Sequence, residues 1–187
     1  MGRGEVMSKR VVLIGVSGVL VVALAVGLYL FQPWRLVTNT TVDEALLVPV
    51  STSETAPGTT SASTTTTSAA APAGPVALAA GPFRSLEHAT TGSASLVRRP
   101  DGTHAVQFEA LDTSDGPDLY VYLSDKTSDS PESAFGSGFT SLGKLKANRG
   151  NQVYDVPAGT DLGAVRSVVI WCKRFSAGFA VAPLEQS

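Results

Sequence analysis

The residue with the clearest capacity for chemistry is Cys172, the single cysteine of the chain. A cysteine becomes nucleophilic or redox-active as a thiolate, which requires a nearby cation or metal and access from solvent. In a strand, Lys173 would point away from the face of Cys172, so Arg174 would be the nearest cation on that face. Free cysteine is also among the residues most often buried in protein cores. The sequence therefore leaves two roles open for Cys172, a redox thiol and a packed core residue.

A metal or haem group is the alternative to chemistry at sulfur. His88 and His104, together with Cys172, match the ligand count of a blue-copper site, but both histidines are remote from the cysteine in sequence. Covalent haem of the c type is excluded because the chain has no Cys-x-x-Cys-His motif. Methionine-ligated haem is excluded because Met1 and Met7 both precede the globular region. No cofactor is assigned, and we expect His104 to be an exposed hairpin residue.

Three aspartates recur at every third position in the segment DTSDGPD. Asp112, Asp115 and Asp118 could suggest calcium binding, but the spacing is not that of an EF-hand. Aspartate with Gly and Pro is typical of a tight turn held by side-chain to backbone hydrogen bonds. The chain also lacks the Gly-x-Ser-x-Gly elbow of serine hydrolases. We therefore predict a turn and no metal site, and enzyme activity stays open.

The residues that could position Cys172 have the patterns of strands. Short β-branched and aromatic runs alternate with turn residues from Pro82 onward, and no stretch there has a helical period. The sequence predicts an all-β domain at residues 81–187, either a β-sandwich or a barrel-like fold. The predicted strands lie at 93–99, 103–109, 119–124, 139–146, 151–156, 166–175 and 178–182, with hairpins at Asp101-Gly102 and at residues 147–150.

The predicted strand that contains Cys172 is apolar on both faces. Val168, Ile170 and Cys172 would share one face, and Val169 and Trp171 the other. Such a strand is expected in the interior of a sheet with both of its faces covered. We therefore expect Cys172 to project with aliphatic side chains.

An apolar run near the N-terminus predicts a transmembrane helix. Residues 11–31 would extend about 32 Å as a helix and match a hydrocarbon core of about 30 Å. Arg3, Lys9 and Arg10 precede the run, which places residues 1–10 in the cytoplasm and the rest of the chain outside. A cleaved signal peptide is the alternative, but the run is longer than a signal h-region and lacks an Ala-x-Ala-like site. We predict a single-pass protein of the cell membrane with an extracytoplasmic C-terminal domain.

Residues 32–80 have the composition of an extracytoplasmic linker. Ser, Thr, Ala and Pro dominate residues 51–74, which contain no aromatic residue. Such a sequence cannot build a core and predicts a disordered tether. Glycosylation of its Ser and Thr residues stays open.

The charge of the chain limits its partners. The formal net charge is −2 at pH 7, and acidic and basic residues are mixed in the C-terminal hundred residues. Without a large field of one sign, nucleic acid is not an expected partner. The expected partners are the membrane and a redox or envelope protein.

Four short motifs and several spaced residues resemble one known family, the DM-thirteen domain, often labelled an electron-transfer domain. In its multidomain animal relatives this domain occurs beside DOMON modules and cytochrome b-type membrane domains. The matching residues are FRSLEH at 83–88, TGSA at 91–94, GPDLYVYL at 116–123 and VIWC at 169–172, followed by Phe175, Phe179, Ala182 and Leu184.

The resemblance covers about residues 81–184 and implies an extracytoplasmic β domain. It also implies that Cys172 matches a near-invariant cysteine for which a redox role has been proposed. Ala180 departs from the family pattern, since relatives tend to have Gly there. The companion modules are absent from this sequence, so the resemblance implies an electron donor or acceptor on another molecule.

Two functional hypotheses follow from the sequence. In the first, the protein is a membrane-tethered extracytoplasmic module with a redox or electron-transfer role centred on Cys172. In the second, it is a non-catalytic binding or structural module of the cell envelope, and Cys172 is buried in its core.

Overall fold

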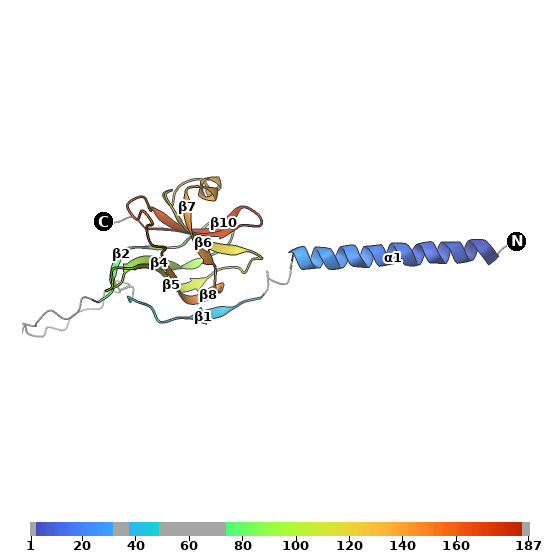
Figure 1. The fold of residues 1–187 in the computed structure, drawn as a ribbon, viewed down its shortest axis with the longest axis horizontal. Helices are drawn as coiled ribbons and strands as arrows, with labels where there is room; N and C mark the ends of the chain where they lie inside the picture. Colours follow the sequence, from blue (N-terminus) through green and yellow to red (C-terminus); the bar gives the residue numbers. More distant parts are fainter. Residues whose placement is uncertain (1–2, 32–37, 49–73, 185–187) are drawn as a thin grey trace, which may run out of the picture. The chain divides into compact units, whose positions relative to one another are not determined.

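The computed structural model places most of the chain (Figure 1). It describes residues 3–31, 38–48 and 74–184. Most of the predicted low-complexity linker, residues 49–73, lies outside the described residues. The chain divides into two compact units, Met1–Thr38 and Asn39–Ser187.

Helix α1, Arg3–Phe31, lies in the first unit. The sequence predicts a membrane span at residues 11–31, within this helix. In the part of the chain that the structure describes, no helix combines the length and the apolar character needed to cross a membrane. The predicted transmembrane helix is therefore not supported by the structure.

The second unit is an all-β domain of two five-stranded sheets. Sheet A has the strand order β1-β8-β5-β4-β2, and sheet B has the order β3-β10-β9-β6-β7. The described strands do not close into a barrel, so the predicted fold class resolves to a sandwich. The elements are β1 Thr41–Asp43, β2 Val76–Pro82, β3 Arg84–Ser85, β4 Thr91–Arg98, β5 His104–Asp112, β6 Leu119–Ser124, the 3₁₀ helix η2 Glu132–Gly136, β7 Phe139–Lys144, β8 Arg149–Asp155, β9 Ser167–Cys172 and β10 Ala177–Pro183.

One of the two predicted hairpins is confirmed, and the other is wrong. Strands β4 and β5 pair across the Asp101-Gly102 turn, where Gly102 has the positive φ of 83° that the turn requires. Strands β7 and β8 do not pair, because β7 belongs to sheet B and β8 to sheet A. Gly150, taken from sequence as a turn residue, has φ 96°, and a Cβ there would collide with the Val42 carbonyl oxygen. This glycine thus allows a close approach of two strands.

The main core lies between the two sheets. Leu96, Phe108 and Ile170 are among its fully buried side chains. The ring of Phe108 packs edge-on against Phe83, with 5.0 Å between centroids, and lies 5.2 Å from the ring of Tyr154. Burying one such phenyl ring contributes about 1.5 to 3 kcal/mol. The inward-facing apolar residues of the two sheets therefore pack against one another in this core.

A second apolar cluster covers the outer face of sheet B. Helix η2 inserts Phe135 against Tyr122 and Val169, and Trp171 and Val181 complete the buried cluster. As a result, all six residues of β9 are buried. The expectation of an interior strand with both faces covered is confirmed.

The predicted linker contributes two pieces to sheet A. Residues 39–48, which we call the docked segment, include β1, which pairs with the edge of β8. Residues 76–80 belong to β2, which forms the opposite edge of the sheet. The sequence-based boundary at residue 81 therefore does not coincide with the edge of the sheet.

A fragment of residues 81–187 should be less stable than one of residues 39–187. Starting at Gly81 removes the docked segment and most of β2, including the buried Ala79 and a row of ladder hydrogen bonds. We expect its free energy of unfolding in urea to be lower by more than about 2 kcal/mol, since each lost hydrogen bond costs about 1 kcal/mol. A fragment of residues 74–187, which lacks the docked segment and residues 49–73 but keeps β2, should fall between the two. Equal stability of all three fragments would contradict this assignment of the domain boundary.

Candidate functional site

Cys172 is a packed residue at the end of the central strand of sheet B. It is the last residue of β9, and its side chain is 0% exposed. It belongs to the cluster between the sheets together with Ile170. Its ladder partners are Leu119 of β6 and Ala177 of β10. The thiol is free and buried among apolar side chains, as its spacing predicts.

The two cations that follow Cys172 lie outside the strand. Strand β9 ends at Cys172, and residues 173–176 form an exposed turn. The backbone N–H of Lys173 donates to the carbonyl of Asp118 at 3.0 Å. The expectation that Arg174 shares the strand face of Cys172 is wrong, because strand alternation stops before it is reached.

Residues from separate motifs meet at the end of the sandwich that holds Cys172. The imidazole of His88 stacks on Phe179, with 3.8 Å between ring centroids. A Cβ at Gly116 would lie 3.0 Å from both Phe179 and Leu119, closer than side chains normally pack. Since Leu119 is the ladder partner of Cys172, the motifs build one contiguous cluster. In this structure His88 is a stacking residue on the family motif.

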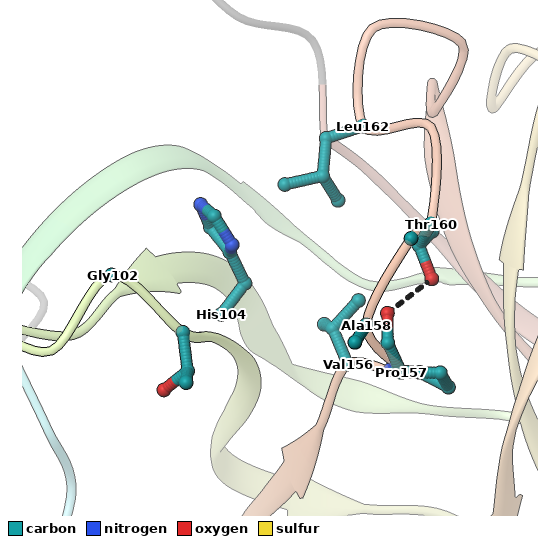
Figure 2. Close-up of a pocket in the computed structure, with 9 residues that line it drawn as sticks. Gly102, His104, Val156, Pro157, Ala158, Thr160 and Leu162 are labelled. Atoms are coloured by element: carbon teal, nitrogen blue, oxygen red, sulfur yellow. Dashed lines mark hydrogen bonds between the residues drawn. The ribbon is translucent and has the colours of Figure 1, made fainter.

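His104 lines a pocket at the other sheet. It is the first residue of β5, is half-buried, and borders a pocket of about 370 Å³ (Figure 2). Val156, Pro157 and Leu162 supply apolar walls from the loop after β8. The hydroxyl of Thr160 donates to the carbonyl of Pro157 at 2.7 Å, which holds this loop in shape. His104 therefore flanks the hairpin turn as expected, but it is half-buried where we expected an exposed residue.

The candidate metal ligands are not brought together. Among the described residues, no three His, Cys, Asp or Glu side chains lie close enough to hold a metal ion. Each of the three aspartates has a different partner instead. Asp112 accepts from Arg149 at 3.0 Å, Asp115 accepts from the N–H of Gly116 at 2.8 Å, and Asp118 lies 3.5 Å from the Lys144 ammonium.

Aromatic rings and lysines share the outer face of sheet B. The ammonium groups of Lys144 and Lys173 lie 5.8 Å and 5.5 Å from the ring centroid of Tyr120. On the same strand, Tyr122 stacks on the half-exposed Phe139 at 3.9 Å. Such rings combine apolar area with a polar edge or an adjacent charge, which suits an interaction surface.

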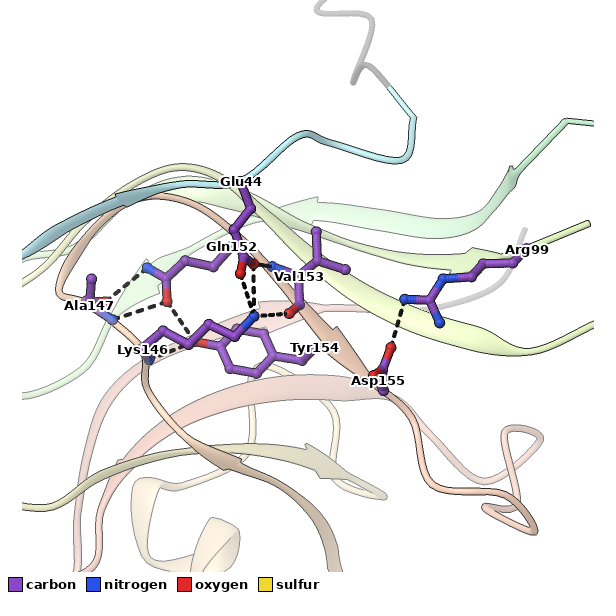
Figure 3. A network of polar contacts seen from close by, with 8 residues as sticks. All are labelled: Glu44, Arg99, Lys146, Ala147, Gln152, Val153, Tyr154 and Asp155. Atoms are coloured by element: carbon purple, nitrogen blue, oxygen red, sulfur yellow. Dashed lines mark hydrogen bonds and ion pairs between the residues drawn. The ribbon is translucent and has the colours of Figure 1, made fainter.

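A polar network joins the docked segment to sheet A (Figure 3). The ammonium of Lys146 donates to both carboxylate oxygens of Glu44, at 2.7 and 2.8 Å, and to the carbonyl of Val153 at 2.6 Å. The N–H of Val153 donates back to Glu44 at 2.6 Å. The hydroxyl of Tyr154 donates to Gln152, and burial raises the pKa of this hydroxyl. The hydrogen bond from Lys146 is the main cause that lowers the pKa of Glu44.

Sequence reasoning missed the residues of this network. Glu44 stands in a short apolar stretch within residues 32–80, which the sequence assigns to the linker, and its partner Lys146 lies about a hundred residues away. Gln107 carries a usable signal, because it is a lone amide in an otherwise apolar part of β5. A polar residue within a buried strand needs a partner, and here the partner is the docked segment.

Comparison with known proteins identifies one family. Residues 82–184 match the model of the family DM13, described as electron transfer DM13. No curated protein matches the chain, and no solved structure matches it. The matched residues agree with the resemblance read from the motifs at about 81–184.

Docking of residues 39–48 should weaken in acid. The pKa of the Glu44 carboxyl is lower in the docked state than the ordinary Glu value of 4.5, so ionised Glu44 stabilises docking at pH values above 4.5. This stabilisation is lost as the pH falls through the lowered pKa. Protonation of Glu44 removes its negative charge from the contact with Lys146. The negative charge of nearby Asp155 raises the pKa of Glu44 and so opposes part of the lowering by Lys146. Hydrogen exchange at the amides of Glu44 and Leu47 should show protection at about pH 6 that decreases as the pH falls below 4.5.

Glu44→Gln is the matched control for this measurement. It keeps the shape of the side chain but cannot titrate, so exchange at these amides, corrected for its intrinsic pH dependence, should no longer change over this range. Protection in the wild type that is unchanged across the same range would refute the role of Glu44.

Proposed function

Because the chain belongs to the electron transfer DM13 family, we propose that its β domain is a tethered binding module of an electron-transfer system, with Cys172 as a core residue. Family membership supplies the link to electron transfer. The observation that favours a binding role over redox chemistry at the thiol is the complete burial of Cys172 among apolar side chains. Thiol–disulfide exchange requires a thiolate to contact the other sulfur directly, and burial prevents that contact.

The outer face of sheet B supports a binding role. Tyr120 lies beneath two ammonium groups, and the side chain of Lys144 is 69% exposed. Phe139 is 39% exposed beside them. Aromatic residues are enriched in protein interfaces, and exposed charges steer association with a partner of opposite sign. This surface fits a partner protein that presents acidic side chains around an apolar centre.

The tether is supported by the sequence. The apolar residues 11–31 follow Arg3, Lys9 and Arg10, a distribution typical of a single-span anchor with its N-terminus in the cytoplasm. In this proposal the β domain meets its partner at the outer surface of the cell membrane.

A second candidate function is redox chemistry at Cys172 itself. The observation that favours it is the position of this residue directly before the exposed turn 173–176. Ser176 in this turn has a positive φ of 51°, a conformation that costs energy for a residue with a side chain. Local opening of the turn would bring the thiol to solvent, where it could react.

The two candidates predict different behaviour of Cys172. As a core residue, it should react with a small alkylating agent much more slowly in the folded protein than in urea, because reaction must wait for opening. Cys172→Ser should lower the free energy of unfolding by about 1 to 3 kcal/mol, since it buries an unpaired hydroxyl. Mass spectrometry and urea titration give the two measurements.

Cys172→Ala separates packing from redox function, because it removes the thiol without adding a polar group. The wild type and this variant should show the same electrochemical response in protein-film voltammetry. A signal that is present in the wild type and lost in Cys172→Ala, together with native labelling as fast as that of free cysteine, would favour the redox thiol instead.

The tether predicts the form of the mature protein. The full chain should stay in the membrane pellet after extraction with alkaline carbonate, and its N-terminal sequence should begin before residue 11. A mature chain that begins after Phe31, or one released by carbonate, would remove the anchor from the proposal.

A further inference from the structure

The outer face of sheet A holds the docked segment through its backbone. Gln107, on the middle strand β5, is 0% exposed. Its carboxamide oxygen accepts from the N–H groups of Leu47 at 3.0 Å and Val48 at 3.2 Å, and its amide nitrogen donates to the carbonyl of Val48 at 2.5 Å. A primary amide that both donates to and accepts from backbone groups makes hydrogen bonds similar to those of a paired strand residue. This contact does not depend on the side chains of the segment.

The edge of β8 holds the segment in a similar manner. Strand β1 adds to β8 in parallel, with Thr41 opposite Arg149 and Asp43 opposite Asn151. The N–H of Arg149 donates to the carbonyl of Thr40 at 3.1 Å. Addition of an extended peptide to a sheet edge is a common mode of peptide recognition, in which main-chain hydrogen bonds supply the affinity.

Two side-chain pairs give the site its selectivity. Glu44 bonds to Lys146 through both carboxylate oxygens, and the amide of Asn151 donates to the carboxylate of Asp43 at 2.7 Å. Gly150 leaves room for the carbonyl of Val42 beside them. The site therefore fits an extended peptide with two adjacent carboxylates.

The polar groups of the site need an occupant. Asn148 is 2% exposed, and its carboxamide oxygen accepts from the N–H of Thr40 at 2.7 Å. Without the segment, Asn148 and Gln107 would lose hydrogen bonds. Among the described residues of the segment, none belongs to the buried core. The segment is therefore held by contacts that an equivalent peptide could replace.

The chain that follows the segment is longer than docking requires. Val48 lies against β5, and the chain is described again at Gly74, just before β2. Strand β2 is two strands away from β5, or about 10 Å at the usual strand spacing. Residues 49–73 could extend to roughly 80 to 90 Å. This length allows the segment to reach a neighbouring molecule as well as its own sheet.

We propose that the outer face of sheet A and the edge of β8 form a strand-binding site that exchanges residues 39–48 between two copies of this chain. A reciprocal exchange keeps every contact of the monomer. The equilibrium between monomer and exchanged dimer therefore depends on two quantities, the concentration of chains in solution and the effective concentration of the segment at the site of its own chain. The composition of residues 49–73 predicts a flexible coil, for which the effective concentration of the segment at its own sheet is in the millimolar range. Dimers therefore form where chains are crowded, as on a membrane surface.

Disulfide trapping in the full chain tests the exchange. Asp43 and Asn151 are ladder partners, and neighbouring strands lie about 4.8 Å apart, which suits a disulfide. A chain with Asp43→Cys is mixed with a differently sized chain with Asn151→Cys, and both keep the buried Cys172. Under mild oxidation the mixed disulfide dimer should increase as the concentration rises from about 10 μM to about 1 mM.

Matched controls separate exchange from collision. Replacing the acceptor by Ser141→Cys, at an exposed position in sheet B, gives the collision background. Adding Gln107→Leu to both chains should lower the mixed dimer toward this background. A chain with Asp43→Cys and Asn151→Cys together should form the disulfide within one molecule when dilute. Mixed dimer at background up to 1 mM, or no disulfide at all in the double variant, would overturn the proposal.

Discussion

Burial of β9 on both faces is the constraint on which the rest of the domain depends. One face packs against sheet A across the main core, and the other is covered by Phe135 from η2. The strand is also paired on both edges, by β6 and β10. Because every residue of β9 is buried, its side chains are apolar except that of Ser167, whose hydroxyl donates to the carbonyl of Lys126 at 2.7 Å. The layers on either side of the strand must both be present to bury it.

This constraint also decides what Cys172 meets. It is the last residue of β9 on the inner face and lies beside its ladder partners Leu119 and Ala177. The exposed turn 173–176 follows it directly in the chain. His88, Gly116 and Phe179 assemble around the same end of the sandwich through stacking and close packing. The motif residues of the electron transfer DM13 family thus form a packed cluster, and the solvent-exposed lysines and half-exposed rings of sheet B lie on its outer face.

The outer face of sheet A carries polar side chains, and without residues 39–48 the edge of β8 would be unpaired. An open strand edge invites pairing with other chains. Residues 39–48 cover this edge and satisfy Gln107 and Asn148 from a segment far away in sequence. The Glu44–Lys146 ion pair adds a charge requirement to contacts that are otherwise made to the backbone. The hydrogen bonds that cover the edge of β8 are therefore the same ones that a second chain would use in the proposed exchange of residues 39–48.

The sequence by itself determined the all-β class, the Asp101-Gly102 hairpin, the interior position of β9 and the aliphatic surroundings of Cys172, because alternation and turn chemistry are local. It could not assign β7 and β8 to different sheets, since residues 147–150 have the composition of a hairpin turn, whereas the chain crosses between the sheets over residues 145–148. It could not recognise residues 39–48 as part of sheet A, because their stability comes from partners about a hundred residues away. Only the tertiary structure decided these points, since long-range pairing depends on which surfaces the rest of the fold leaves uncovered.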